Sequence, residues 1–289
     1  MYQILEKNNL AHRVDRYVID AKDIAIKAKA GQFVIIKLDE HGERIPITIA
    51  DMDANKGTLT LYVQAVGKTT MQLSYMKAGD KIMDVVGPLG KASHIEKYGT
   101  VVSIGGGFGI APIHPIVREY KMAGNKTVSI IGARSKELII MEEDIKKISD
   151  DFRIVTDDGS YGKKGLVTNI LQDMIDSNEK IDLVLAIGPL IMMKAVSEMT
   201  RPHKIKTLVS MNPIMVDGTG MCGACRLSVG NEIKFACVDG PEFDGHLVNY
   251  DEVWTRLNMY SKEEKKSANL FMQNHDCNLD KAINQLEAK

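Results

Sequence analysis

Three cysteines in one short, glycine-rich segment are the residues of this chain with the clearest capacity for chemistry. Cys222 and Cys225 are separated by two residues, and Cys237 follows after eleven more. Asp217 stands five residues before Cys222, so the four side chains follow an Asp-x4-Cys-x2-Cys-x11-Cys pattern. With cysteine in place of the aspartate, this pattern would begin with the C-x4-C-x2-C spacing of plant-type two-iron clusters. We therefore interpret the segment as a [2Fe-2S] site with three thiolate ligands and one carboxylate ligand.

The glycines of this segment support the same interpretation. Gly218, Gly220 and Gly223 let the backbone turn closely around a cluster and point amides at its sulfurs. A structural zinc is the alternative, because zinc also accepts three cysteines with a carboxylate or histidine. The segment lacks a second cysteine pair with the usual zinc-knuckle spacing, which favours iron and sulfur. Cys277, in a polar stretch, and His246, in the turn-like DGH, are not assigned as ligands.

A second motif, GGGFGIAP at residues 105–112, lies between an apolar strand and a helical stretch. Its glycines let the backbone approach a pyrophosphate, whose charge the helix N-terminus then stabilises. The formal G-x-G-x-x-G fingerprint is not met, because Ile110 stands at the last glycine position. GARS at 132–135, TDDGS at 156–160 and IGPL at 187–190 follow other strands and belong on the same rim of a parallel sheet. Each of these loops, taken singly, can equally be an ordinary connection.

A third group of polar residues lies nearer the N-terminus, in RIPITI at 44–49 and VGKTT at 66–70. An arginine, hydroxyl groups and loop amides are the groups that a flavin diphosphate needs. By themselves, the same residues also suit an ordinary strand and turn.

The elements that must position these motifs fall into two patterns. Residues 2–97 contain short β-rich runs separated by turns, which predicts a small antiparallel barrel. From residue 100, apolar strands alternate with helical stretches, which predicts a parallel sheet covered on both faces. The predicted fold class is therefore a β-barrel plus an α/β Rossmann-like parallel-sheet domain, with a small C-terminal iron-sulfur lobe.

We predict four consecutive units along the chain. They are a barrel at 1–98, a Rossmann-like domain at 99–210, a cluster lobe at 211–250 and a helical extension at 251–289. The cluster lobe is too small to build its own apolar core and so is expected to need a metal. In the extension, Trp254, Leu257 and Phe271 are the expected anchors.

Composition restricts the class of protein and its partners. The 289 residues suggest about two main domains. Lysine and arginine number 37 against 38 aspartates and glutamates, so no strong positive field exists to bind nucleic acid or an anionic membrane. The longest apolar stretch, 183–193, is far shorter than the ~20 residues of a membrane span. The first residues lack an export pattern, so we expect a cytoplasmic location.

Taken in order, these motifs resemble the ferredoxin-NADP reductase superfamily, specifically its iron-sulfur flavoprotein electron-transfer subunits. The resemblance rests on AGQFVIIKL, RIPITI, VGKTT, GGGFGIAP, GARS, IGP and the cysteine segment, and it covers residues 1–260. The chain is similar to the small subunits of NADH-dependent reduced ferredoxin:NADP oxidoreductase, also called sulfide dehydrogenase small subunits. It is also similar to the electron-transfer subunits of type B dihydroorotate dehydrogenase.

The resemblance implies an FAD barrel, an NAD(H) lobe and a two-iron cluster, but it assigns no catalytic side chain. It implies flavin contacts from Arg44, Pro46, Ile47, Thr48, Gly67, Thr69 and Thr70. It implies nucleotide contacts from Gly105, Gly106, Gly107, Gly109, Ala111, Pro112, Arg134, Asp158, Gly188 and Pro189, and iron ligation by Asp217, Cys222, Cys225 and Cys237. The chain departs from the family pattern where Ile47 replaces an aromatic residue and where Arg44 stands one residue further from Thr48.

The activity implied is hydride transfer between NAD(H) and FAD, followed by single-electron transfer through the cluster. The resemblance also implies a heterodimer with a larger subunit that carries its own flavin and four-iron clusters, and an indirect link to ferredoxin through electron bifurcation. Asp217 favours the ferredoxin:NADP type over the dihydroorotate type, which carries cysteine there. Arg134 and Lys136 are suited to binding a 2′-phosphate, so the residues alone do not exclude NADP. The resemblance favours NAD(H). The alternative from a different functional class is a non-enzymatic nucleotide sensor with a structural zinc.

Overall fold

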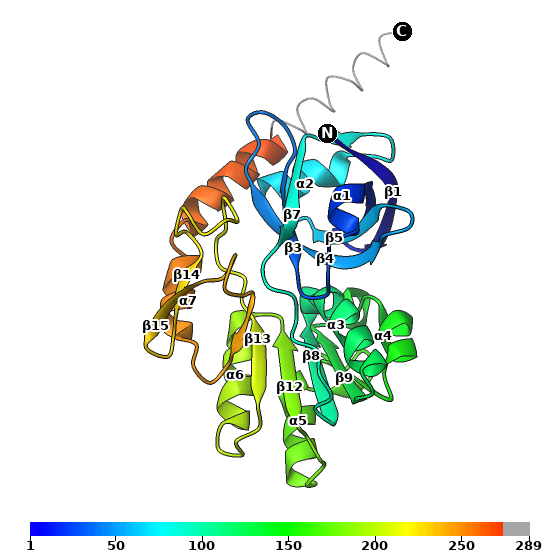
Figure 1. Ribbon diagram of the computed structural model, residues 1–289, viewed down its shortest axis with the longest axis vertical. Coiled ribbons are helices and arrows are strands. Elements are labelled where there is room, and N and C mark those ends of the chain that lie inside the picture. The colour runs from blue at the N-terminus through cyan, green and yellow to red at the C-terminus, as the bar shows by residue number, and fades with distance from the viewer. Residues whose placement is uncertain (274–289) are drawn as a thin grey trace.

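The computed structural model describes residues 1–273, which form two large lobes with a smaller lobe beside both (Figure 1). Cys277 and the rest of the predicted helical extension beyond residue 273 lie outside the described residues. The four domain boundaries stay predictions.

The N-terminal lobe is an antiparallel sheet that almost closes on itself. Its strands are β1 (Tyr2–Ala11), β2 (Val14–Asp20), β3 (Phe33–Lys37), β4 (Ile45–Asp53), β5 (Thr58–Gln64), β6 (Lys81–Ile82) and β7 (Asp84–Leu89). They pair in the order β6-β1-β2-β5-β4-β3-β7. Because only Met83 separates β6 from β7 in the chain, the two edges of the sheet are tied together. Fully buried Ile19, Val34, Ile36 and Ile49 fill the interior, which confirms the predicted barrel.

Two helices of this lobe are not expected from the sequence, namely α1 (Lys22–Ala25) and α2 (Lys68–Tyr75). The VGKTT motif suits a turn, yet α2 begins within it. The Thr70 Oγ1 accepts the backbone N–H groups of Val66 and Gly67, both at 3.0 Å, and so caps the helix start. Leu73, one turn later, is buried in the barrel core.

The second lobe is a sheet with helices on both faces. Its strands are β8 (Thr100–Gly106), β9 (Lys126–Ala133), β10 (Asp151–Thr156), β11 (Lys163–Lys164), β12 (Leu183–Ile187), β13 (Thr207–Ser210) and β16 (Glu242–Asp244). They pair in the order β11-β10-β9-β8-β12-β13-β16, and all pairs except β13 with β16 are parallel. Successive strands β9 and β10 are added on one side of β8, and β12 and β13 are added on its other side. The carboxyl ends of β8 and β12 therefore form the topological switch point, where such sheets bind ligands.

The helices of this lobe divide between the two faces. They are α3 (Ile110–Met122), α4 (Glu142–Ile148), α5 (Val167–Asp176) and α6 (Leu190–Thr200), with single 3-10 turns η1 (Gly107–Gly109) and η2 (Lys136–Leu138). One core cluster joins α3 and α4 to the sheet, and another joins α5 and α6 to its other face. This arrangement confirms the predicted parallel-sheet domain.

The segment that carries the cysteines does not stand apart from the second lobe. It contains the hairpin β14 (Arg226–Val229) and β15 (Glu232–Phe235), and then β16, which pairs antiparallel with β13. Buried Phe243 of β16 lies opposite Val209, so the segment packs into the hydrophobic core of the larger sheet. This edge strand is not expected from the sequence.

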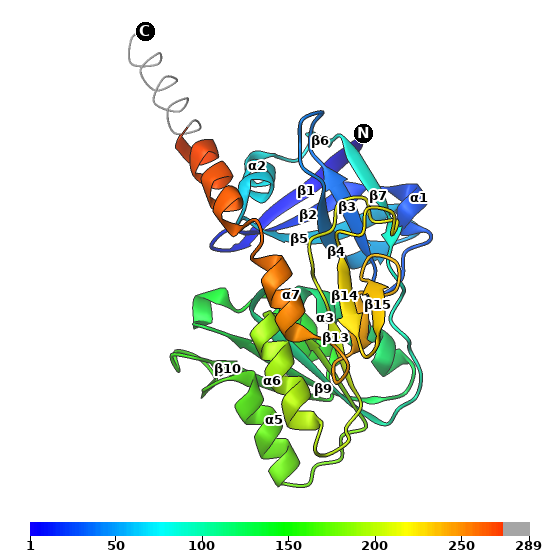
Figure 2. The same cartoon turned by 90° about the vertical axis from the view of Figure 1, so that its left-hand side faces the viewer.

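The C-terminal part described consists of α7 (Tyr250–Leu257) and a helix at 261–273. α7 lies beside α6, and the last helix runs beside α2 of the barrel (Figure 2). The rings of Phe271 and Tyr75 lie 6.1 Å apart there, and Leu257 packs against the core, as expected of anchors. Trp254 is 57% exposed, so its expected role as an anchor is wrong.

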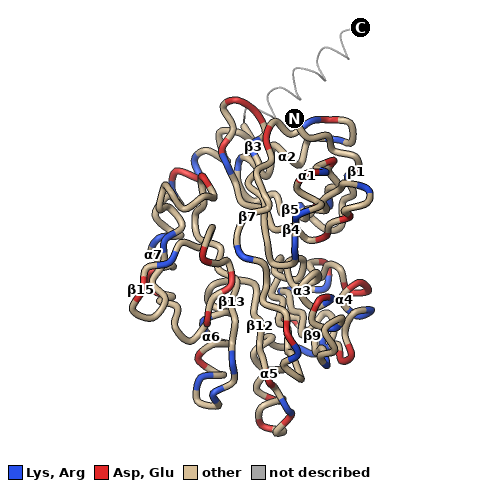
Figure 3. The backbone as a smooth tube through the Cα atoms, in the orientation of Figure 1, with Lys and Arg blue, Asp and Glu red and all other residues tan. Residues whose placement is uncertain are grey.

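Acidic and basic positions are interspersed over both large lobes (Figure 3). Within residues 1–273, no helix is long and apolar enough to cross a membrane.

Candidate functional site

A cavity of about 950 Å³ lies where the barrel meets the switch point of the parallel sheet. The barrel contributes residues of β3, β4 and β5, and the second lobe contributes the loops that follow β8, β9, β10 and β12. The segment that leads from β13 toward the cysteines closes a further side through Met211, Asn212 and Met215. A single hollow therefore borders all three parts of the molecule.

Most residues predicted to contact cofactors line this cavity. They are Pro46, Ile47, Thr48, Thr70, Gly106, Gly107, Gly109, Pro112, Arg134, Gly188 and Pro189. Six others do not line it: Arg44, Gly67, Thr69, Gly105, Ala111 and Asp158. The hydroxyl of Thr69 instead donates to the Glu43 carboxylate at 2.6 Å, and Ala111 is buried in the core. Which of these residues touch a cofactor stays a prediction.

The glycines of the loop after β8 serve two different purposes. A Cβ at Gly109 would stand 2.0 Å from the carbonyl oxygen of Ile187, and one at Gly105 would stand 2.9 Å from the Cα of Ile110. These two glycines allow the loop to pack on its neighbours. Gly107 differs, because its φ is +55° and no protein atom lies within 4 Å of its Cβ position. Gly107 also lines the cavity.

Several cavity residues carry too weak a signal in the sequence to be predicted. Asp157 lines the cavity, whereas neighbouring Asp158 does not, and the Asp158 carboxylate accepts the backbone N–H and hydroxyl of Ser160 at 2.9 and 2.7 Å. The TDDGS motif points to this loop but gives no means of choosing between two adjacent aspartates. Met211 and Met215 carry no signal, because methionine in an apolar stretch predicts only burial.

Arg44 lies against the cysteine segment, although the resemblance implies a flavin contact. Its Nε donates to the carbonyl of Val216 at 2.8 Å, and its Nη2 lies 3.5 Å from the carbonyl of Asp217. Its Nη1 also forms an ion pair with Asp84 at 3.5 Å. The barrel thus holds the start of the predicted cluster loop through this side chain.

The β14–β15 hairpin brings two of the cysteines together. Cys225 immediately precedes β14 and Cys237 follows β15 by one residue, so the antiparallel pairing places their sulfurs 3.2 Å apart. Both side chains are buried. Burial raises the pKa of the Cys237 thiol to about 12, and the neighbouring Cys225 sulfur adds to the rise. A metal that binds these sulfurs must displace a proton.

Asp217 and Cys222 form a second pair at the exposed end of the loop. The Asp217 carboxylate accepts the backbone N–H of Cys222 at 3.0 Å and that of Thr219 at 3.1 Å. Burial opposes its charge, but these donors outweigh that effect and lower the pKa of Asp217 to about 2. The positive φ angles of Gly218 and Gly220 make this turn possible. The carboxylate caps the turn in this structure, and iron ligation by Asp217 stays a prediction.

The donor set fits a two-iron cluster. In the part of the chain that the structure describes, no group of three or more His, Cys, Asp or Glu side chains could hold one metal ion. A two-iron centre instead takes two protein ligands on each iron, and the residues here form two such pairs. His246 is engaged elsewhere, because its Nε2 lies 2.9 Å from the Thr200 hydroxyl.

The two buried cysteines share a packed core with the wall of the cavity. Cys225 and Cys237 belong to the same apolar cluster as Phe33, Met211 and Met215, and these last three residues also line the cavity. The cavity wall and the buried cysteine pair therefore belong to one continuous apolar core.

Three protein-family models match successive parts of the chain. Residues 2–94 match an oxidoreductase FAD-binding domain, and residues 104–198 match an oxidoreductase NAD-binding domain. Residues 212–249 match the iron-sulfur cluster binding domain of dihydroorotate dehydrogenase B. The chain is thus an oxidoreductase with FAD-binding, NAD-binding and iron-sulfur domains.

Relatives match most of the chain. A Thermotoga maritima protein named as a homolog of the dihydroorotate dehydrogenase B (NAD+) electron transfer subunit is 48% identical, over 94% of this chain and 95% of its own length. The electron transfer subunit of that enzyme from Bacillus pumilus is 34% identical, over 76% of this chain and 86% of its own. A chain from a structure of NADH-dependent reduced ferredoxin-NADP oxidoreductase, determined to study flavin-based electron bifurcation, has a TM-score of 0.89 and 46% identity, covering 94% of this chain and 98% of that one.

Proposed function

Because this chain belongs to the family of dihydroorotate dehydrogenase B electron-transfer subunits and their homologues, we propose that it takes hydride from NADH in the cavity and passes electrons through a [2Fe-2S] cluster to a partner subunit. FAD, when bound, supplies the conversion between two-electron hydride transfer and one-electron transfer. The continuity of the apolar core from the cavity wall to the buried cysteine pair supports this proposal. Phe33, Met211 and Met215 belong to the same core as the two cysteines, and each lines the cavity.

The chain's own residues would hold the two cofactors in this cavity as follows. Pro46, Ile47 and Thr48 of β4 form the barrel wall, where the flavin would lie. Gly107 presents an unobstructed backbone at the switch point, where the pyrophosphate of the nucleotide would meet the start of α3. Apolar Met192 and Met211, which also line the cavity, would help to exclude water from the hydride path.

The cavity also supports NADH over NADPH. Asp157 and Arg134 both line it, at the ends of adjacent strands β10 and β9. A carboxylate at this edge can accept hydrogen bonds from ribose hydroxyls, whereas it repels a 2′-phosphate. We propose that the repulsion of a 2′-phosphate by Asp157 outweighs its attraction by Arg134.

Steady-state oxidation of both nucleotides with an artificial acceptor tests this function. The flavin-loaded chain should oxidise NADH and leave NADPH nearly untouched. Asp157→Asn should raise the relative rate with NADPH about tenfold, which corresponds to ~1.4 kcal/mol of lost discrimination. Asp158→Asn is the matched control and should change nothing, because Asp158 does not line the cavity. Equal rates with both nucleotides in the unaltered chain would refute the assignment.

We further propose the ferredoxin:NADP branch of this family for the partner. The relatives are named as subunits, which implies a larger partner. Asp217 stands where the dihydroorotate type is expected to carry cysteine, and the similarity to the oxidoreductase chain spans almost all residues. The partner would carry a second flavin and four-iron clusters, and the complex would couple NADH, NADPH and ferredoxin by bifurcation.

Co-expression with candidate large subunits tests the branch. A complex that reduces NADP+ only when NADH and reduced ferredoxin are both supplied supports the proposal. A complex that oxidises dihydroorotate would instead place the chain in the other branch.

A further inference from the structure

α7 lies outside the matched iron-sulfur domain at 212–249, yet two of its side chains reach the cluster lobe. Glu252 and Arg256 stand four residues apart, on one face of the helix. The Glu252 carboxylate accepts the backbone N–H of Ser228 at 3.0 Å. The Arg256 Nη2 donates to the carbonyl of Ala224 at 2.9 Å. Ala224 is one of the two residues between Cys222 and Cys225, so Arg256 contacts the ligand loop itself.

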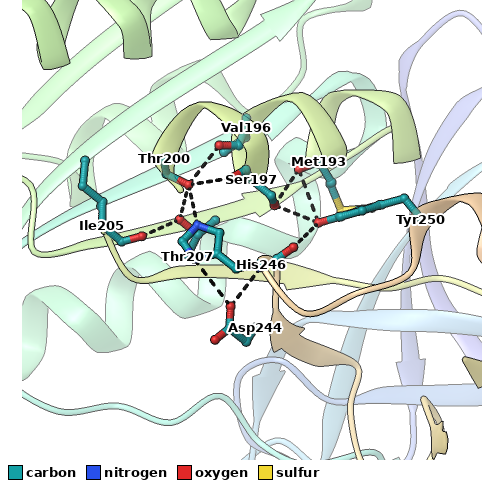
Figure 4. A network of polar contacts seen from close by, with 10 residues as sticks. Met193, Val196, Ser197, Thr200, Ile205, Thr207, Asp244, His246 and Tyr250 are labelled. Atoms are coloured by element: carbon teal, nitrogen blue, oxygen red, sulfur yellow. Dashed lines mark hydrogen bonds and ion pairs between the residues drawn. The ribbon is translucent and has the colours of Figure 1, made fainter. Parts of the chain in front are cut away.

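A buried polar network fixes α7 on the second lobe (Figure 4). The hydroxyl of Tyr250, the first residue of α7, lies 2.7 Å from the Ser197 hydroxyl of α6 and donates to the carbonyl of Gly245 at 3.2 Å. One turn along α6, Thr200 contacts His246 at 2.9 Å. Because this network ties α7 and β16 to α6, the distance between Arg256 and the cysteine loop is held by packing rather than by a mobile surface contact.

The charge of Arg256 is not balanced within the described chain. Across residues 1–273, no carboxylate lies within ion-pair distance of its guanidinium, and its Nε is buried without a hydrogen-bond acceptor. The two other arginines near the loop differ. Arg44 is paired with Asp84, and Arg226 is exposed where it donates to the carbonyl of Gly223 at 3.1 Å. Arg256 is therefore the arginine near this loop whose charge is both partly buried and unneutralised.

We propose that Arg256 is a positioning residue that raises the reduction potential of the iron-sulfur cluster. The inference rests on the proposed function, because it requires a cluster at Cys222, Cys225 and Cys237. A guanidinium stays protonated at any working pH, and a cluster becomes more negative when it accepts an electron. A fixed positive charge beside the ligand loop stabilises that reduced form, and partial burial limits screening by salt. Net charge around a cluster is one of the properties that set its potential.

The test compares three variants of the full chain carrying flavin and cluster. Arg256→Gln removes the charge and shortens the side chain, and Arg256→Lys keeps the charge but loses the forked donor. Arg226→Gln is the matched control, because Arg226 makes the same kind of contact with the adjacent carbonyl from an exposed position. The measurements are the midpoint potential from an EPR-monitored redox titration and the rate of iron loss to a chelator.

Arg256→Gln should lower the equilibrium constant for one-electron reduction of the cluster about tenfold, or ~59 mV. Arg256→Lys and Arg226→Gln should stay near the unaltered potential, while Arg256→Lys loses iron faster. An unchanged potential in Arg256→Gln would overturn the inference. If Arg256→Gln loses its cluster, the test rests on Arg256→Lys. A tenfold fall in the equilibrium constant for cluster reduction in Arg256→Lys would then overturn the role of charge. Absence of a two-iron cluster from the unaltered chain would overturn the proposed function instead.

Discussion

A side chain introduced at position 107 distinguishes the effect of backbone packing from the effect on ligand binding. Gly107 precedes α3 with φ +55°, and no protein atom lies within 4 Å of the position that a Cβ would take. Gly107→Ala should therefore fold, at a cost of about 1 to 2 kcal/mol for placing a side chain in the left-handed region. Because Gly107 lines the cavity, we expect the added methyl group to obstruct the place where the backbone meets the pyrophosphate. We expect the Kd for NADH to rise at least about tenfold, or ~1.4 kcal/mol, with a larger rise for Gly107→Val.

Gly124, just beyond the other end of α3, provides the control for backbone strain. Its φ is +81°, and the nearest atom to its Cβ position is 4.0 Å away, on Lys97. Gly124→Ala should lose a similar amount of stability in urea unfolding without any change in NADH binding. Calorimetric titration of NADH into both variants, each with its flavin content measured, decides the matter. Equal NADH affinities in Gly107→Ala and Gly124→Ala would show that Gly107 serves only the turn.

Three further predictions concern the cluster loop and the core. Asp217→Cys should retain a two-iron cluster with a shifted potential and shifted EPR g-values, whereas Asp217→Ala should make the cluster labile and Cys277→Ser should do neither. An unaltered spectrum in Asp217→Cys would leave Asp217 as a turn cap only. Tyr250→Phe should lower the free energy of unfolding by about 1 to 3 kcal/mol, because its buried partners lose a hydrogen bond, while Tyr260→Phe at an exposed position should have little effect in the same urea titration. Burial raises the pKa of Glu242, so the stability that its protonated form contributes is lost as the pH rises through that pKa. Glu242→Gln should therefore be more stable than the unaltered chain at pH 8 and gain little at pH 4, and equal gains at both would contradict the raised pKa.

The large elements could be predicted because their patterns are local. Apolar runs such as 127–133 and the helical period of 190–199 need no knowledge of distant residues, and both lobes form as expected. α2 could not be predicted because its start depends on a threonine cap inside a turn-like motif. β16 could not be predicted because a three-residue strand is stable only against the edge of a sheet built more than thirty residues earlier.

The cysteine spacing identifies the cluster segment for a similar reason, since ligand spacing is a local property. The surroundings of that segment could not be predicted in the same way. Arg44 and Arg256 come from the barrel and from the C-terminal helix, and only the tertiary fold brings both to the loop. Asp157 could not be separated from Asp158, because only the folded loop decides which of the two residues lines the cavity.

Anaerobic titration of the purified chain with NADH, followed by visible absorption and EPR, tests the proposed electron transfer most directly. We expect a yellow-brown protein with FAD and equal iron and inorganic sulfide. NADH should bleach its flavin absorption and produce the EPR signal of a reduced two-iron cluster. A colourless protein that contains zinc, or a flavin that NADH does not reduce, would contradict the proposed function.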